Sequence, residues 1–163
     1  MEKEFINLLN QNRGILYKIC RVYCMEAADR QDLFQEIVLQ LWKAYPSFKQ
    51  QANISTWMYR IGMNTAISNY RKQKKRQPPI AFSNMSSPLP DLSDADDMPV
   101  ETAVLYKAID QLTQIEKAVV LLYLEDKSYE EMAIILGIGK SNVGVKLNRI
   151  KVKLEKIMKS ITC

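Results

Sequence analysis

Apolar residues recur every three or four positions along most of the chain, which is the periodicity of amphipathic α-helices. The first run covers residues 2–24 and predicts a helix with a bend at Gly14. A second helix is predicted over 30–45, with Asp29 as its N-cap and Asp32 in its first turn, where a carboxylate is favoured by the helix dipole. Glycine is scarce and Leu, Ile, Glu, Lys and Gln dominate long segments, so the sequence predicts an all-α protein.

The stretch from Ile54 to Arg76 carries two different helical faces. One face is a core-facing apolar stripe made of Ile54, Trp57, Met58, Ile61 and Thr65. Either Asn53 or Ser55 can cap its start. The opposite face combines aromatic, amide and cationic side chains: Tyr59, Arg60, Met63, Asn64, Tyr70, Arg71 and Lys74. Rings stack on bases, cations meet phosphates and amides bind base edges, so this face suits a single-stranded nucleic acid. An equal alternative is that Tyr59 and Tyr70 pack against neighbouring helices while the basic tail is solvated.

Residues 77–99 have no helical period and predict a linker. Five of the six prolines of the chain lie there, among serines and aspartates. A stretch of this length without regular structure is uncommon inside one domain and ordinary between two. We therefore expect two helical units, the first with its own core.

The unit after the linker has the pattern of a helix-turn-helix. Thr113–Glu116 and Ser128–Glu131 are capping boxes, and Gly137 suits a left-handed turn before a last helix over 140–157. The start of that last helix would enter a DNA major groove. Its candidate contacts are Lys140, Ser141, Asn142, Val145, Lys146 and Arg149. The alternative is an ordinary helical hairpin within a bundle.

Charge is unevenly distributed along the chain. The net charge is +5 and the pI is about 9.0. No Asp or Glu occurs between Ile37 and Pro90, acidic residues alone fill the charged positions of 91–101, and the C-terminal stretch is basic again. Two basic modules around an acidic break indicate an anionic partner.

Several kinds of chemistry are not expected. The chain contains no histidine, which removes the commonest general base and metal ligand. Cys20 and Cys24 lie one helical turn apart without a second ligand pair, and Cys163 is distant, so free thiols in a reducing cytoplasm are predicted rather than a metal site. No signal region and no apolar run of membrane-spanning length is present. We expect no catalytic residue, no cofactor and no small-molecule substrate.

Together these segments resemble the extracytoplasmic-function (ECF) sigma factors, small two-domain members of the sigma-70 family of RNA polymerase subunits. Residues 32–42 resemble the polymerase-binding helix of that family, residues 48–71 its −10 and promoter-melting segment, and residues 122–149 its −35 helix-turn-helix. The resemblance implies a region 2-like domain over 1–76, a linker over 77–99 and a region 4-like domain over 100–163.

The resemblance also implies roles for individual residues. Core RNA polymerase would contact Asp32, Gln35, Glu36 and Leu39. Contacts to the single-stranded −10 element would come from Phe48, Asn53, Tyr59, Arg60, Asn64 and Arg71. The candidate contacts of the last helix would bind the duplex −35 element. Implied partners are therefore core RNA polymerase, promoter DNA and an anti-sigma factor, and the implied location is the cytoplasm, or the inner membrane where the anti-sigma factor is anchored there.

Departures from the family pattern affect which promoter is recognised. Gly144 stands where the family usually has Lys or Arg, and Val145 where it often has Ser. Ser68 and Asn69 occupy positions where relatives often carry Asp. The alternative function is a stand-alone helix-turn-helix regulator that binds duplex DNA as a dimer. That alternative leaves the exposed apolar residues predicted at Val38 and Leu39 without a purpose.

Overall fold

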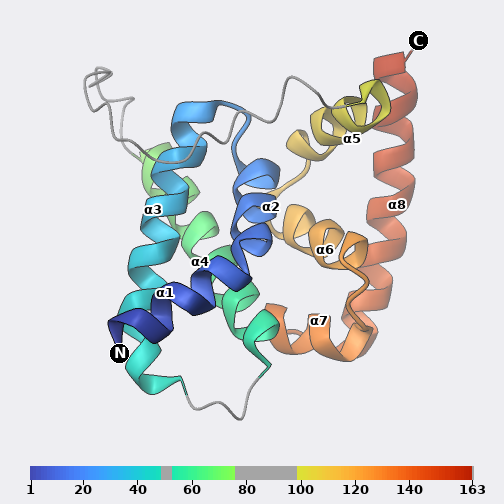
Figure 1. Ribbon diagram of the computed structural model, residues 1–163. Helices are drawn as coiled ribbons and strands as arrows, with labels where there is room; N and C mark the ends of the chain where they lie inside the picture. Colours follow the sequence, from blue (N-terminus) through green and yellow to red (C-terminus); the bar gives the residue numbers. More distant parts are fainter. Residues whose placement is uncertain (49–52, 76–98, 163) are drawn as a thin grey trace.

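The computed structural model describes residues 1–48, 53–75 and 99–162, which form eight α-helices and one 3₁₀ turn without any strand (Figure 1). The N-terminal unit contains α1 (Glu2–Gln11), α2 (Arg13–Tyr23), α3 (Ala27–Ala44), the 3₁₀ turn Tyr45–Ser47 and α4 (Ile54–Lys75). The C-terminal unit contains α5 (Val100–Asp110), α6 (Gln114–Leu124), α7 (Tyr129–Leu136) and α8 (Lys140–Thr162). The predicted all-α fold class is confirmed, while residues 77–98 of the predicted linker lie outside the described residues.

The first predicted helix is two helices, and the break is at Asn12 rather than Gly14. Asn12 leaves the helical region with φ −124° and ψ 21°, and its side-chain amide donates to the carbonyl of Leu8 at 2.9 Å. Asparagine favours such local bonds over continuing a helix. Gly14 lies inside α2 and does not mark the break.

The start of α3 also differs from the prediction. The helix begins at Ala27, and Asp29 lies in its first turn instead of capping it. The preceding connection is held by the buried Arg30, whose guanidinium donates to the carbonyl oxygens of Cys24 at 3.3 Å and Met25 at 2.7 Å. These bonds satisfy carbonyls at the end of α2 that have no partner within the helix.

Both N-caps predicted in the C-terminal unit are confirmed, and the one at Thr113 is a complete capping box. The Thr113 hydroxyl accepts from the Glu116 amide at 3.2 Å, and the Glu116 carboxylate accepts from the Thr113 amide at 2.9 Å. The Ser128 hydroxyl accepts from the Glu131 amide at 3.1 Å. Gly137 has φ 70° at the end of α7, a conformation that glycine adopts without a steric cost. These turns fix where α6, α7 and α8 begin.

Three helices of the N-terminal unit pack around one core. The fully buried side chains include Leu16 and Ile19 of α2, Ile37 and Leu41 of α3, and Met58 of α4. Helices α2 and α4 come so close that a Cβ on Gly62 would lie 2.6 Å from Ile19 Cδ1. Any larger residue at this position would require the end of the Ile19 side chain to move.

The two units pack against each other, and their buried residues form one continuous cluster. Helix α2 contacts α5 and α6, and α4 contacts α6 and α7. The sequence predicted that the N-terminal unit has a separate core of its own. In the structure that core continues into the C-terminal unit, because apolar faces of α2 and α4 remain open until α5, α6 and α7 cover them.

Candidate nucleic-acid interface

The first half of α8 presents all of the predicted −35 residues to solvent. The buried side chains of Val143, Leu147 and Ile150 fix which side of α8 faces the core. The opposite side carries the exposed predicted set: Lys140, Ser141, Asn142, Val145, Lys146 and Arg149. Lys140 also bridges to Glu130 at 3.1 Å, which ties the start of α8 to the start of α7. The helix thus has the form of a recognition helix with a polar and cationic outer face.

A cationic cleft of about 290 Å³ runs between α8 and the start of α6. It is lined by Lys146 and Arg149 of the predicted set and by Lys153, which the sequence did not single out. Lys153 bridges to Glu116 at 2.9 Å. Burial alone would raise the pKa of Glu116, but hydrogen bonds from Lys153 and Thr113 outweigh it and hold that pKa below its usual value. A cleft of this charge beside the recognition helix suits a DNA phosphate.

Tyr129 of α7 lies beside Gly144 of the recognition helix. A Cβ on Gly144 would lie 3.5 Å from Cε2 of the Tyr129 ring, and the ring is itself 39% exposed. The ring therefore flanks the recognition helix on the side opposite the cationic cleft. Sequence reasoning missed Tyr129 because the pattern assigned it only to the first turn of a helix.

On α4, the exposed polar face is narrower than predicted. Arg60, Asn64 and Arg71 are exposed, as the nucleic-acid interpretation requires. Asn53 is exposed as well, and its side-chain oxygen accepts from the Ser55 amide at 2.9 Å, so Asn53 caps the helix. The half-buried Phe48 packs against the Trp57 ring with centroids 4.5 Å apart.

The placement of Tyr59 and Met63 on the outer face of α4 is wrong. Tyr59 is 1% exposed and Met63 is 2% exposed. Helix α4 packs against α2 and α3 and also against α7, so more of its circumference is buried than a single stripe indicates. The alternative prediction for Tyr59, that it packs against neighbouring helices, is confirmed. Tyr70 is 44% exposed.

A polar cleft of about 380 Å³ lies between α3 and α4. It brings together Glu36, one of the predicted polymerase contacts, and Asn64, one of the predicted −10 contacts. Thr65, Ser68 and Asn69 also line it, and they offer hydroxyl and amide groups. The cleft has the size and chemistry to hold a polar planar group such as a base.

The predicted polymerase contacts lie along one side of α3. Asp32 and Gln35 are exposed, Glu36 is partly exposed and Leu39 is 44% exposed. The Gln40 amide donates to the Glu36 carboxylate at 3.0 Å. Because Leu33, Ile37 and Leu41 supply the buried stripe, Leu39 is an apolar side chain that the fold does not use.

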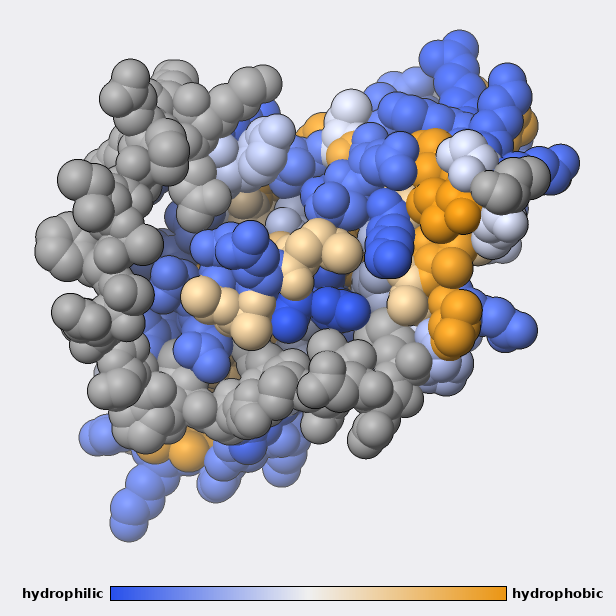
Figure 2. Space-filling model, turned by 90° about the horizontal axis from the view of Figure 1, so that it is seen from above, coloured by the Kyte–Doolittle hydropathy of each residue, from blue (hydrophilic) through white to orange (hydrophobic). Residues whose placement is uncertain are grey.

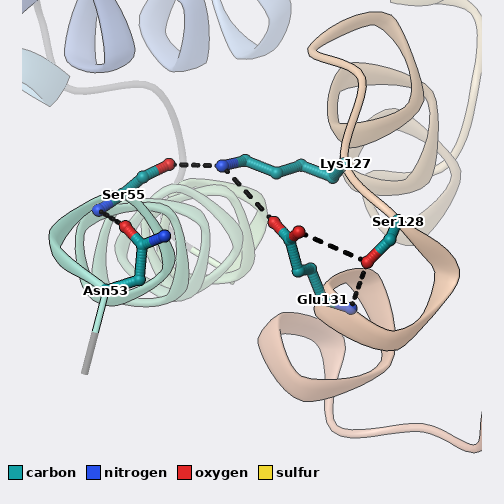
Figure 3. A network of polar contacts seen from close by, with 5 residues as sticks. All are labelled: Asn53, Ser55, Lys127, Ser128 and Glu131. Atoms are coloured by element: carbon teal, nitrogen blue, oxygen red, sulfur yellow. Dashed lines mark hydrogen bonds and ion pairs between the residues drawn. The ribbon is translucent and has the colours of Figure 1, made fainter. Parts of the chain in front are cut away.

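The turn between α6 and α7 (the α6–α7 turn, residues 125–128) contacts the N-terminal unit, a feature that no sequence pattern indicated. The Lys127 ammonium donates to the Ser55 hydroxyl at 2.5 Å and lies 3.6 Å from the Glu131 carboxylate (Figure 3). It also lies 5.5 Å from the centre of the Tyr59 ring. The C-terminal unit therefore contacts the first turns of α4 at Ser55 and Tyr59.

Glu125 of the same turn makes two more contacts across the boundary. Its carboxylate bridges to Lys18 of α2 at 2.7 Å and forms a hydrogen bond with the Tyr59 side chain. Burial, with the negative charge of Glu125 adding to it, raises the pKa of Tyr59 well above its usual value. Tyr59 is thus held as a neutral phenol between the two units.

Other surface features are plainer. On the face seen in Figure 2, the described residues are largely hydrophilic, with an apolar strip on the side where α5 and α8 lie. Over residues 1–48, 53–75 and 99–162, no three Cys, Asp or Glu side chains come together as a metal site. None of the helices described is long and apolar enough to cross a membrane.

Comparison with known families matches both units. A model of sigma-70 region 2 matches residues 8–76, and a model of sigma-70 region 4 matches residues 102–154. Both describe sigma-factor regions rather than a catalytic family.

Individual relatives agree with these matches. The chain is 27% identical to the ECF RNA polymerase sigma factor SigX of Bacillus subtilis, over 88% of this chain and 77% of the relative. It is 28% identical to the ECF RNA polymerase sigma factor RpoE of Cereibacter sphaeroides, over 77% of this chain and 72% of the relative. It is 30% identical to the ECF RNA polymerase sigma-E factor of Escherichia coli, over 68% of this chain and 63% of the relative.

Two solved structures share the fold at 20% sequence identity, each with a TM-score of 0.71. They are CnrH in complex with the cytosolic domain of CnrY, covering 98% of this chain and 90% of the other, and the sigma factor RpoE of Bartonella quintana in complex with the anti-sigma factor NepR, covering 97% and 96%. The chain matches sigma-70 regions 2 and 4 in that order, its recognition helix exposes a polar face, and the relatives named above are sigma factors. The chain therefore belongs to the ECF sigma factors of the sigma-70 family, which direct RNA polymerase to promoters.

Proposed function

We propose that the two units divide the promoter between them. The C-terminal unit binds the duplex −35 element through α8, with Arg149 and Asn142 facing base edges and Lys146 facing phosphates. The observation that carries this assignment is that every predicted contact on α8 is exposed on one side of a helix whose other side is buried. Arginine paired to guanine, and asparagine to adenine, are the common base contacts in a major groove.

The N-terminal unit binds the −10 element as a single strand. Arg60 and Arg71 face the phosphates, and the cleft with Asn64 holds a base turned out of the stack. Taking a base out of a duplex costs a few kcal/mol, and capture in a polar cleft offsets that cost without ATP. Phe48 and Asn53, near the start of α4, would contact the same strand further along.

Core RNA polymerase binds the α3 face that carries Asp32, Gln35, Glu36 and Leu39. The exposed side chain of Leu39 would contribute to binding through the apolar area that a partner buries. We further propose that the protein acts in the cytoplasm, is not an enzyme and is held by an anti-sigma factor, a partner that the similar Bartonella quintana structure contains.

Run-off transcription with purified core polymerase tests the proposal. The protein added to core polymerase should produce new start sites on a genomic library, and the protein alone should bind the same promoters weakly. Binding of promoter DNA should weaken steeply with salt, because each phosphate contact releases a counterion. Tight footprints without polymerase, together with no new start sites, would instead support a stand-alone regulator.

A further inference from the structure

The middle of the exposed side of α8 carries no charge over the first half of the helix. Residues spaced four and three positions apart form one row there: Ser141, Val145 and Asn148. All three side chains are exposed, and Val145 is 48% exposed. The outermost row of the recognition helix is therefore uncharged, although the helix as a whole is rich in lysine.

Lysines lie on both sides of this uncharged row. On one side, Lys146 and Lys153 line the cationic cleft. On the other side, Lys140 pairs with Glu130 of α7 at 3.1 Å. In a major groove the phosphates of the two strands lie at the sides, and the base edges form the floor. The lysines therefore suit the phosphates, and the uncharged row suits the base edges.

Val145 belongs to an apolar patch that continues onto α7 and consists of Tyr129, Gly144 and Val145. A Cβ on Gly144 would lie 3.5 Å from the Tyr129 ring, and the ring is 39% exposed. Gly144 contributes no side chain of its own. Apart from the Tyr129 hydroxyl, the side chains of this patch thus offer no charge and no hydrogen-bonding group.

Only one group on the base edges matches such a patch. In the major groove the bases display hydrogen-bond donors and acceptors, and thymine alone adds an apolar group, its C5-methyl. A valine side chain cannot donate or accept a hydrogen bond, so it can favour a base only by apolar contact.

We propose that Val145, with the Tyr129 ring beside it, selects a thymine in the −35 element through the C5-methyl group. This inference rests on the function proposed above for α8, and it names a base that the contacts proposed there leave open. Lys146 and Arg149 hold the duplex, and the apolar patch chooses between base pairs at one position.

The first experiment identifies the position and removes the methyl group. The holoenzyme, made from core RNA polymerase and the full-length protein, is offered duplex promoters randomised over the −35 element, and the bound DNA is sequenced. One position should be dominated by thymine on one of the two strands. Deoxyuridine at that position removes only the methyl group, and holoenzyme affinity should then fall about fourfold, the effect expected for one buried methyl group.

The second experiment asks whether Val145 makes the contact. With the Val145→Ala protein, the thymine and deoxyuridine promoters should differ by less than about 1.5-fold, because a lost contact cannot be lost twice. Val152→Ala is the matched control: Val152 is 55% exposed on the second half of α8, outside the proposed contacts, and this variant should keep the fourfold difference. Tyr129→Phe should keep the difference as well, whereas Tyr129→Ala should reduce it.

The outcomes separate this inference from the proposed function. A selected −35 sequence without a thymine preference would overturn the methyl contact and leave the proposed function standing. So would a deoxyuridine effect that is as large for Val145→Ala as for the wild type. A holoenzyme that selects no −35 sequence at all would refute the proposed role of α8 and the thymine contact with it.

Discussion

At the scale of single residues, neighbouring side chains on α3 serve different purposes. Leu41 is fully buried, whereas Leu39 is 44% exposed two positions earlier. Burial of a leucine in a core contributes to folding, but an exposed one contributes only when a partner covers it. On the same helix, Leu41 therefore contributes to folding, whereas Leu39 is available to bind a partner.

Replacing Leu39 with alanine should abolish polymerase binding and leave folding intact. The free energy of unfolding should change little, since the side chain makes few contacts within the chain. The control is Leu41→Ala, which should cost about 2–5 kcal/mol of stability because it leaves a cavity. Binding to core polymerase and thermal unfolding of both variants provide the check, and a Leu39→Ala protein that unfolds like Leu41→Ala would show that Leu39 belongs to the core.

Replacing Arg149 with alanine should weaken use of the −35 element. The loss should be about 1–3 kcal/mol if the guanidinium makes two bonds to one base. Transcription from promoters that differ only at the −35 element measures the effect, because the variant should discriminate less between them. Lys159→Ala on the last turn of α8 is the matched control, and an equal loss for both variants would argue for a general effect of charge.

At the scale of elements, the turn between α7 and α8 decides how the recognition helix is presented. Gly137 ends α7 in the left-handed region, and Lys140 begins α8 three residues later. Buried Met132 and Ile135 anchor α7 on the core, and Val143 anchors α8. The direction of the exposed face of α8 thus depends on one backbone conformation.

Replacing Gly137 with alanine should destabilise the protein by about 1 kcal/mol, because a side chain in the left-handed region clashes with its own backbone. The neighbourhood is not the cause, since a Cβ at that position would meet no atom within 4 Å. Gly139→Ala is a close control: it also has open space and it lacks the positive φ. Chemical denaturation of both variants measures the difference, and equal stabilities would contradict this role for Gly137.

At the scale of the whole molecule, burial between helices holds several acidic groups in their neutral form. Burial raises the pKa of the Cys20 thiol to about 12 and that of the Cys24 thiol to about 11, and it raises the pKa of the Tyr23 hydroxyl further. The Tyr23 hydroxyl donates to the carbonyl of Gln114 at 2.9 Å, so it also joins the two units. The packing of the two units is therefore linked to proton binding at high pH.

Stability should consequently fall at alkaline pH. Below pH 9.0, the ordinary value for a thiol, both folded and unfolded chains keep the proton and the contribution is complete. As the pH rises from 9.0 toward about 11, the unfolded chain releases protons that the folded chain retains, and each such group removes about 1.4 kcal/mol per pH unit. Urea denaturation across this range measures the slope. The Cys20→Ala variant should show a shallower slope, and an unchanged slope would exclude Cys20 as a source.

Most of the local structure could be predicted because its causes lie close together in the chain. The Thr113 and Ser128 caps, the left-handed Gly137 and the buried stripe of α8 each depend on side chains within a few residues. The break at Asn12 and the start of α3 at Ala27 were local features that the pattern missed, whereas the error at Tyr59 arose where a distant segment intervened. Tyr59 was placed on an outer face because its burial against the turn between α6 and α7 depends on residues about 70 positions away.

The sequence by itself determined the helical class, the caps of the C-terminal unit and the polar outer side of α8, since short-range backbone and side-chain chemistry fixes all three. Only the tertiary structure decided that the two units share a core, that Lys18, Glu125 and Lys127 meet at their boundary, and that Glu36 and Asn64 line one cleft. Such contacts are individually weak and join residues far apart in the chain. Their formation depends on the packing of whole helices, and no local pattern records it.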